Sequence, residues 1–216
     1  MKELIIIGAG GFGREVKCLI DDINRSLQSP AYSILGFVDD GVAAGTAVHE
    51  YEVLGTSDYI DALESKPALV LAIGNPTIKA GLAKRFHSYD FPTLVHPTVS
   101  LTGTNIQIGK GCIICAGNLL TCDIQIADFV ILNLTCTVGH DTEIGSYCSI
   151  MPGVNISGEV ILQEAAYIGT GATIINQTEL GEGCVIGAGA VVSKSIPAHC
   201  TAVGIPAKPI KFHTHE

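Results

Sequence analysis

The chain has 216 residues, of which 47% are hydrophobic and 6% aromatic, and it carries a formal net charge of −9 at pH 7. This length accommodates one large or two small domains, and the acidic balance argues against a nucleic-acid or anionic-membrane partner. No apolar run approaches the roughly 20 residues of a membrane span. The apolar stretch Leu4–Ile7 is too short for a secretory signal, so we expect a cytoplasmic protein.

The first 95 residues alternate short apolar runs with helical stretches. Strands are expected at residues 4–7, 34–38, 68–73 and 93–95, and helices at residues 11–27, 57–65 and 77–87. Such an alternation predicts a small parallel sheet covered by helices, which we assign to a Rossmann-like α/β domain over residues 1–95. The boundary falls at His96-Pro97, because the residue before a proline favours extended backbone.

A glycine-rich turn follows the first expected strand. The segment Gly8-Ala9-Gly10-Gly11-Phe12-Gly13 matches the G-x-G-x-x-G pattern, whose glycines allow backbone N–H groups to approach a diphosphate closely. The second strand ends in Asp39-Asp40, where a carboxylate can accept hydrogen bonds from a ribose or a base. Glycines needed only for a tightly packed turn would give the same pattern. The position of the turn between a strand and a helix, together with the acidic end of the second strand, favours nucleotide binding. With three or four strands, the domain suits a mononucleotide, such as the UDP part of a sugar nucleotide, better than a dinucleotide.

Every sixth residue from Ile108 to Val192 is Ile, Leu or Val, which makes fifteen positions without a miss or an insertion. A helix face with a 3.6-residue period cannot follow a period of six, whereas short strands joined by identical corners can. The segment is therefore predicted to be a parallel β-helix of five 18-residue turns, within a second domain over residues 96–216. Positions one and five of each hexapeptide should point inward, and positions two to four should form the corners. Flat faces with few charges favour a homo-oligomer.

Eight cysteines raise the question of metal binding. Four of them occupy the fifth position of a hexapeptide, which other repeats fill with Ala or Val, namely Cys112, Cys136, Cys148 and Cys184. They are interpreted as small buried apolar residues. Cys112 and Cys115 form a lone CxxC without a second ligand pair at zinc spacing, so no metal is expected.

His140 is the only histidine between residues 97 and 198, and it falls at the third position of its hexapeptide, so it should project from a corner. Asp141 follows it. A carboxylate beside an imidazole fixes its tautomer and raises its basicity, which suits a general base near neutral pH. A solvated corner histidine is the alternative, but the scarcity of charge at the other corners favours a catalytic pair.

The pattern of the hexapeptide-repeat acyltransferases is carried by three hexapeptides, IGSYCS at 144–149, IGTGAT at 168–173 and IGAGAV at 186–191. The segment VGIPAK at 203–208 resembles the ending of that family. With the glycine turn, the Asp39-Asp40 pair and Ala72-Ile73-Gly74-Asn75, nearly the whole chain resembles the sialic acid O-acetyltransferase-like branch. This branch includes the UDP-4-amino-sugar N-acetyltransferases of the bacillosamine pathway.

The resemblance implies a left-handed β-helix and a homotrimer, with acetyl-CoA in the groove between two β-helices and the nucleotide sugar on the N-terminal domain. His140 would be the general base, and Asp141 would tune it. The residues that match nucleotide-sugar positions are Gly10, Gly11, Phe12, Asp39, Asp40, Gly74 and Asn133. Those that match positions along the acetyl-CoA groove are Ser149, Gly169, Thr170 and Ala188. Relatives often have histidine where this chain has Phe12, and some have a second histidine where it has Ser149. Both departures bear more on which substrate the resemblance implies than on the type of reaction.

We therefore expect an acetyltransferase that passes the acetyl group of acetyl-CoA directly, without an acyl-enzyme, to a nucleotide-activated amino sugar. N-acetylation of a UDP-4-amino sugar is the leading prediction, and a sialic acid or other sugar O-acetyltransferase is the alternative within this class. A zinc carbonic anhydrase on the same fold needs three histidine ligands, and the repeat has one. A nicotinamide oxidoreductase has no support in the β-helix. A nucleotide-sugar sensor or a structural trimer is the non-enzymatic alternative.

Overall fold

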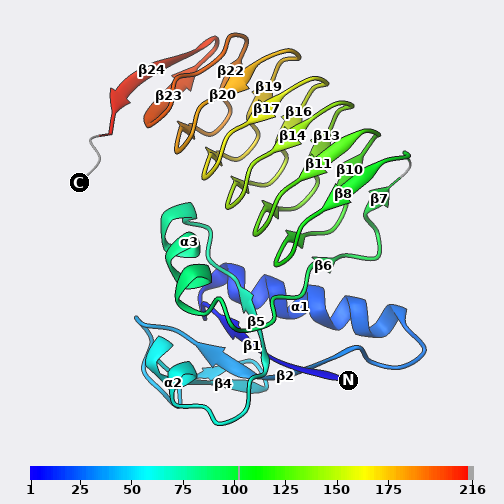
Figure 1. The fold of residues 1–216 in the computed structure, drawn as a ribbon, viewed down its shortest axis with the longest axis vertical. Coiled ribbons are helices and arrows are strands. Elements are labelled where there is room, and N and C mark those ends of the chain that lie inside the picture. Colours follow the sequence, from blue (N-terminus) through cyan, green and yellow to red (C-terminus); the bar gives the residue numbers. More distant parts are fainter. Residues whose placement is uncertain (102, 214–216) are drawn as a thin grey trace.

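The computed structural model describes residues 1–101 and 103–213, which form an N-terminal α/β unit and a C-terminal parallel β-helix (Figure 1). The α/β unit lies at the lower end of the view beside the first turns of the β-helix, and the C-terminal hairpin lies at the opposite end. Within these residues, no helix combines the length and the apolarity needed to cross a membrane.

The α/β unit consists of a sheet of five strands and three helices. Its strands are β1 (Lys2–Ile7), β2 (Tyr32–Val38), β3 (Ala47–Val48), β4 (Tyr51–Gly55) and β5 (Ala68–Leu71), and its helices are α1 (Gly11–Ser26), α2 (Ser57–Asp61) and α3 (Pro76–Arg85). The sheet order is β3-β4-β2-β1-β5, with β1 parallel to both β2 and β5, as the alternating pattern predicted. The β3–β4 hairpin was not predicted, because its strands are short and one of them has only two residues.

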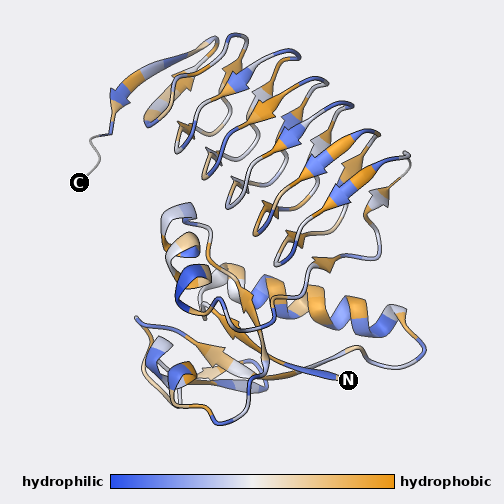
Figure 2. Ribbon diagram, in the orientation of Figure 1, coloured by the Kyte–Doolittle hydropathy of each residue, from blue (hydrophilic) through white to orange (hydrophobic). Residues whose placement is uncertain are grey.

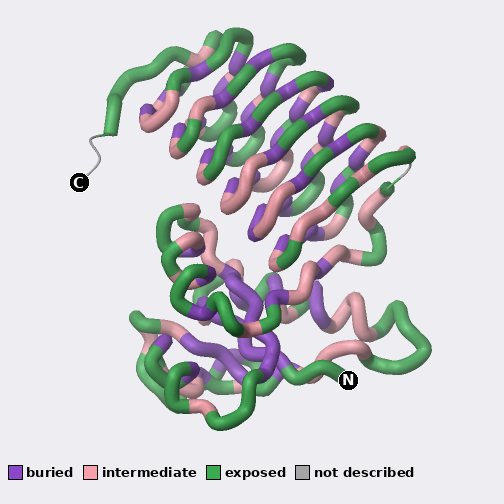
Figure 3. The backbone as a smooth tube through the Cα atoms, viewed as in Figure 1, coloured by how far each residue is buried: buried purple, intermediate pink, exposed green. Residues whose placement is uncertain are grey.

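The core of the α/β unit follows from the alternation of side chains along β1. Leu4 and Ile6 pack in the cluster beside α1, whereas Ile5 and Ile7 pack in the cluster that includes residues of α3. Successive side chains of a strand point to opposite faces of its sheet, so a continuous apolar run predicts a strand buried on both sides. Figures 2 and 3 show these central strands as hydrophobic and buried.

The β-helix has three faces. Face 1 contains β6 (Leu94–Val95), β9 (Ile113–Ile114), β12 (Ile131–Leu132), β15 (Ser149–Ile150), β18 (Tyr167–Ile168), β21 (Val185–Ile186), β23 (Cys200–Gly204) and the antiparallel β24 (Ala207–Phe212). Face 2 contains β7 (Ser100–Leu101), β10 (Leu119–Leu120), β13 (Thr137–Val138), β16 (Asn155–Ile156), β19 (Thr173–Ile174) and β22 (Val191–Val192). Face 3 contains β8 (Ile106–Ile108), β11 (Ile124–Ile126), β14 (Glu143–Ile144), β17 (Ile161–Leu162) and β20 (Glu179–Leu180). The chain passes from face 1 to face 2, face 3 and back, and we call the edges between them corner 1/2, corner 2/3 and corner 3/1.

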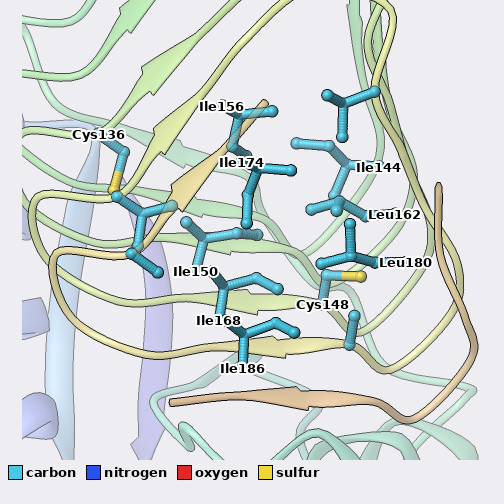
Figure 4. Close-up of a cluster of buried hydrophobic side chains, with 14 of the residues drawn as sticks. Cys136, Ile144, Cys148, Ile150, Ile156, Leu162, Ile168, Ile174, Leu180 and Ile186 are labelled. Atoms are coloured by element: carbon cyan, nitrogen blue, oxygen red, sulfur yellow. The ribbon is translucent and has the colours of Figure 1, made fainter. Parts of the chain in front are cut away.

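The interior of the β-helix confirms the predicted phase of the repeat. All first positions after Ile108 and all fifth positions of the hexapeptides are buried, and residues such as Ile150, Ile168 and Ile186 stack directly over one another (Figure 4). The cysteines of the fifth position are part of this core, and burial raises the pKa of the Cys148 thiol to about 12. These cysteines are therefore packing residues.

Each corner bends the chain through a residue with left-handed backbone. The fourth residue of every hexapeptide from residue 108 to residue 191 has a φ between 54° and 74°, yet only six of these fourteen residues are glycine. Hydrogen bonds between successive turns hold the others in place, as where the Asp141 N–H donates to the Cys122 carbonyl oxygen at 3.3 Å. The left-handed conformation is therefore imposed by the stacked turns even on residues that disfavour it.

The β-helix starts one turn earlier than predicted. Strands β6, β7 and β8 pair with β9, β10 and β11, so this turn precedes Ile108. Leu101 pairs with Leu120, 19 residues later, whereas Ile106 pairs with Ile124, 18 residues later. One additional residue before Ile106 thus takes the first turn out of the six-residue phase. Because β6 already belongs to face 1, the β-helix begins two residues before the boundary placed at residue 96.

The α/β unit covers the first strands of face 1. The outward-facing Ile113 and Ile131 of this face join the core beside α1, and Lys79 of α3 reaches Ser149 of β15. Corner 2/3 joins the two faces that the unit does not cover. It therefore lies on the side of the three-faced column that points away from the α/β unit.

Candidate active site

His140 lies on corner 2/3 directly after β13, and its side chain is 56% exposed. Its Nδ1 is 2.7 Å from Oδ2 of Asp141, so the structure brings the two predicted residues into contact. Asp141 has a φ of 55°, a left-handed conformation that aspartate adopts more readily than most residues. With Nδ1 held by the carboxylate, Nε2 is the ring nitrogen that can accept a proton from a substrate.

Cys122 occupies the same corner position one turn before His140. Desolvation, and after it the side chain of Asp123, raise the pKa of the Cys122 thiol above its ordinary value. A thiol that stays protonated is a poor nucleophile. The surroundings of His140 therefore favour general-base chemistry over a cysteine nucleophile.

The glycines of the turn after β1 fall into two groups. A Cβ on Gly8 would lie 2.7 Å from the carbonyl oxygen of Ala72, and one on Gly13 would overlap the carbonyl oxygen of Gly8. Both glycines are thus required for close packing of the helix against the sheet. A Cβ on Gly10 would meet nothing within 4 Å, and Gly11 is also exposed. Packing therefore does not explain Gly10 and Gly11, which leave an open surface at the start of α1.

The two aspartates after β2 have partners within the chain. Asp39 accepts hydrogen bonds from the N–H groups of Ala9 and Gly41, both at 2.8 Å, so it supports the glycine turn. Asp40 accepts a hydrogen bond from the N–H of Ser57 at 2.6 Å, at the start of α2. Each carboxylate oxygen has a second lone pair, so these bonds leave acceptor capacity for a ligand.

Phe12 and Gly74 complete the nucleotide-sugar positions of the α/β unit. The Phe12 ring is half-buried and packs against the core beside α1. Gly74 follows β5, next to Asn75, whose side chain accepts hydrogen bonds from the Thr77 and Ile78 N–H groups at the start of α3. The glycine turn, the aspartates and Gly74 follow three neighbouring parallel strands, so the fold gathers them at one edge of the sheet.

The residues expected near the sugar and the coenzyme share corner 1/2. Thr170 and Ala188 are exposed and lie one above the other. Gly169 is buried, and a Cβ there would lie 2.6 Å from the Ala188 nitrogen. Asn133 is 6% exposed, and its side chain accepts a hydrogen bond from the N–H of Leu134 at 2.7 Å. Thr170 and Ala188 are therefore accessible to a ligand, whereas Gly169 and Asn133 shape the corner.

The structure does not place Ser149 on an accessible groove, in contrast to the expectation from its position in the family pattern. Ser149 is fully buried on face 1 beneath α3, and its hydroxyl accepts a hydrogen bond from Lys79 Nζ at 2.9 Å. Lys79 is 1% exposed, and burial lowers the pKa of its ammonium group to about 7. Nothing in the sequence distinguishes Lys79 from the exposed lysines, because its burial depends on how α3 packs on face 1.

A cavity of about 430 Å³ lies between α1 and the beginning of corner 1/2. Its lining includes Gly11 and Arg14 of α1, His96 at the domain boundary, and Ala116 and Leu134 of corner 1/2. The cavity therefore connects the glycine turn with the corner that carries Thr170 and Ala188 farther along the column. Sequence reasoning missed this cavity, because its walls come from segments about 100 residues apart.

One chain does not bring all the predicted residues together. The edge of the α/β sheet and corner 1/2 meet at the cavity, but His140 lies on corner 2/3, on the other side of face 2. Face 2 presents an uncharged outer surface between these two corners, formed by Leu119, Thr137, Asn155, Thr173 and Val191. In the described part of the chain, no group of three or more His, Cys, Asp or Glu residues is arranged to hold a metal ion.

Fold and site define a β-helix protein that carries an α/β unit with a glycine-rich turn. Residues 3–86 match the PglD N-terminal domain, and residues 159–194 match the bacterial transferase hexapeptide (six repeats). The acetyltransferase domain of PglB from Neisseria gonorrhoeae FA1090 is 30% identical, with a TM-score of 0.87 over 97% of this chain and 100% of that chain. The chain thus belongs to the family of hexapeptide-repeat sugar acetyltransferases with a left-handed β-helix.

Two further relatives indicate the chemistry of the family. The PglB domain is also known in complex with acetyl coenzyme A, and PerB from Caulobacter crescentus in complex with CoA and GDP-perosamine. PerB is 26% identical, with a TM-score of 0.85 over 98% of both chains. A GDP-perosamine N-acetyltransferase from Escherichia coli O157:H7 is 34% identical over 138 residues. That match covers 63% of this chain and 61% of the length of the relative.

Proposed function

We propose that this protein transfers the acetyl group of acetyl-CoA to the amine of a nucleotide-linked 4-amino sugar, of the UDP-4-amino-sugar type, with His140 as the general base. The observation that carries the proposal is the contact of His140 Nδ1 with Asp141, which leaves Nε2 at an exposed corner. Family membership supports the type of reaction, since the relatives named above include a GDP-perosamine N-acetyltransferase.

In the proposed reaction, the amine nitrogen attacks the thioester carbonyl carbon and forms the new C–N bond. His140 Nε2 takes the proton that the nitrogen loses, and the charge of Asp141 stabilises the resulting imidazolium. Backbone N–H groups at the corners would stabilise the oxyanion of the tetrahedral intermediate. The C–S bond then breaks, and the thiolate of CoA receives the proton from the imidazolium. The raised pKa of the Cys122 thiol is consistent with direct transfer, without an acyl-enzyme.

The proposed site requires more than one copy of the chain. The α/β unit covers the first strands of face 1, so corner 2/3 with His140 points away from the cavity and the glycine turn of its own chain. In a homotrimer with parallel columns, corner 2/3 of one subunit would face corner 1/2 of its neighbour across the uncharged face 2. Such an assembly would place His140 opposite the corner of the next subunit that carries Thr170 and Ala188 farther along the column, with acetyl-CoA between the two columns.

The proposed acceptor site lies at the edge of the α/β sheet. The N–H groups of the exposed Gly10 and Gly11 at the start of α1 would bind the diphosphate, and Asp39 or Asp40 would accept hydrogen bonds from the nucleoside. The sugar would then extend from Gly11 into the cavity toward Leu134.

The test is the release of free CoA thiol from acetyl-CoA with a panel of UDP-amino sugars, GDP-perosamine and sialic acids. The proposal predicts turnover with a UDP-4-amino sugar that His140→Ala abolishes and that His87→Ala, a change at an exposed histidine of the α/β unit, leaves intact. Turnover with GDP-perosamine alone would show that the nucleotide of the acceptor is GDP instead of UDP. Turnover with sialic acid alone would indicate O-acetylation. Failure to bind acetyl-CoA would contradict an acetyltransferase and favour a sensor or a structural trimer.

A further inference from the structure

Gly158 stands out among the third positions of the repeat. The fifteen hexapeptides between residues 108 and 197 carry at this position lysine, alanine, cysteine, aspartate, leucine, histidine, serine, proline, glutamate, threonine or asparagine, and glycine only at Gly158. A third position therefore accepts side chains of almost any size and charge. Gly158 is also the residue that lies one turn after His140, at the same position of corner 2/3.

The backbone does not explain this glycine. Gly158 does not have a left-handed φ, whereas the next residue, Glu159, has a φ of 58°. The three atoms nearest to a Cβ built on Gly158 all belong to the His140 imidazole, with Nε2 at 2.5 Å, Cε1 at 2.6 Å and Cδ2 at 2.9 Å. These separations are far below van der Waals contact. An alanine would therefore collide with the ring of His140.

We propose that Gly158 is a positioning residue for His140, and that its missing side chain provides the space in which the imidazole lies. This inference rests on the proposed role of His140 as general base. Asp141 holds the ring at Nδ1, and the bare backbone of Gly158 borders the opposite edge, which includes Nε2. The two turns are tied together by the hydrogen bond from the Glu159 N–H to the His140 carbonyl oxygen at 2.8 Å. The space is thus fixed relative to the backbone of His140.

A methyl group at this position would turn the ring away from Asp141 and move Nε2. A displacement of about 1 Å in a reacting group can lower a rate by about 100-fold. Since the conflict involves only a side chain at an exposed corner, the β-helix should still form. Gly158→Ala is therefore expected to reduce catalysis without preventing folding.

The experiment compares wild type, Gly158→Ala, His140→Ala and the double variant, with Asn176→Ala as the control. Asn176 is exposed at the same corner position one turn after Gly158. We expect Gly158→Ala to lower kcat by about 100-fold and to leave KM for acetyl-CoA within about twofold of wild type. In the His140→Ala background the same change should alter the residual rate by less than about twofold, because the group it displaces is absent.

Two readouts do not depend on turnover. The ¹H–¹³C resonance of the His140 Cε1, assigned by its loss in His140→Ala, should shift in Gly158→Ala and stay in place in Asn176→Ala. The urea midpoint should fall on Gly158→Ala in the wild-type background but not in the His140→Ala background, where no ring opposes the methyl group and only the ordinary effect of replacing glycine with alanine remains.

Two results would overturn the inference. One is an unshifted Cε1 resonance in Gly158→Ala, and the other is an equal fall of the urea midpoint or of the rate in both backgrounds, since Gly158 would then act independently of the ring. Undiminished turnover in His140→Ala would instead overturn the proposed base. The resonance and the urea midpoints would in that case still decide whether Gly158 positions the imidazole.

Discussion

In the wild-type protein, we expect Lys79 to make the free energy of unfolding rise between pH 7 and pH 9. Replacing Lys79 with methionine should remove this contribution. Lys79 is buried between α3 and face 1, and its Nζ donates to Ser149 Oγ at 2.9 Å and to the Cys148 carbonyl oxygen at 3.2 Å. Both acceptors are neutral. Burial therefore lowers the pKa of Lys79 from 10.5 to about 7 in the folded protein.

The sign of this pH dependence follows from the number of protons that Lys79 binds in the folded and in the unfolded chain. Between pH 7 and pH 10.5 the unfolded chain carries a proton on Lys79 that the folded chain has lost, so the free energy of unfolding rises with pH in this window. At 1.36 kcal/mol per pH unit, with a reduced slope near pH 7, the contribution between pH 7 and pH 9 is about 2 kcal/mol. Buried thiols act in the opposite direction, because burial raises their pKa, as for Cys148. The informative quantity is therefore the difference between wild type and variant.

The assay is urea unfolding of wild type, Lys79→Met and Lys84→Met at several values between pH 6 and pH 9. Lys84 is exposed on the same helix and controls for the loss of a lysine from α3. We expect Lys79→Met to gain stability over wild type at pH 7 and to lose this advantage by about 2 kcal/mol at pH 9. Parallel curves for wild type and Lys79→Met would refute a buried ammonium with a lowered pKa. A Lys79→Met/Ser149→Ala double variant removes the unpaired hydroxyl and should show the same pH dependence.

Three further predictions concern catalysis, the packing of the glycine turn and the stability of α3. His140→Ala should lower kcat by about 10²–10⁴-fold with unchanged unfolding by urea, and a loss below tenfold in the thiol-release assay would contradict a general base. Gly13→Ala should prevent stable folding, because its Cβ would overlap the Gly8 carbonyl oxygen, whereas Gly10→Ala should fold normally; equal thermal melts for both would contradict the packing argument. Gly81→Ala, in α3 with nothing within 4 Å of its Cβ, should stabilise the protein by about 0.5–1 kcal/mol, and a lower Tm would count against the exposed helical position.

The β-helix was predictable from the sequence because its six-residue apolar pattern recurs in fifteen consecutive hexapeptides. These hexapeptides define which residues point inward and place His140 at a corner, as the third residue of its hexapeptide, and both follow from phase alone. The first turn was missed because one additional residue before Ile106 breaks that phase. The β3–β4 hairpin was missed because β3 has only two residues, too few to show a period.

Contacts between the two units were not predictable from local pattern. The phase of Ser149 places it on a face but does not show that α3 covers that face and that Lys79 binds the hydroxyl. In the same way, the sequence identifies the glycine turn and His140 as separate motifs. That they lie on different sides of the column depends on which face the α/β unit covers.

The measurement that tests the account most directly is subunit complementation between His140→Ala and Gly10→Glu. Gly10 has a φ of −72° and an open Cβ position, so glutamate is compatible with the fold there, and its charge would repel a diphosphate. Each variant alone should be inactive in the thiol-release assay.

If each site combines the α/β unit of one subunit with His140 of its neighbour, trimers co-expressed at equal levels contain intact sites. One site in four receives Gly10 and His140 together, so we predict about one quarter of wild-type turnover. Turnover in the mixture no greater than in the separate variants, with mixed trimers demonstrated, would contradict a site built by two copies of the chain.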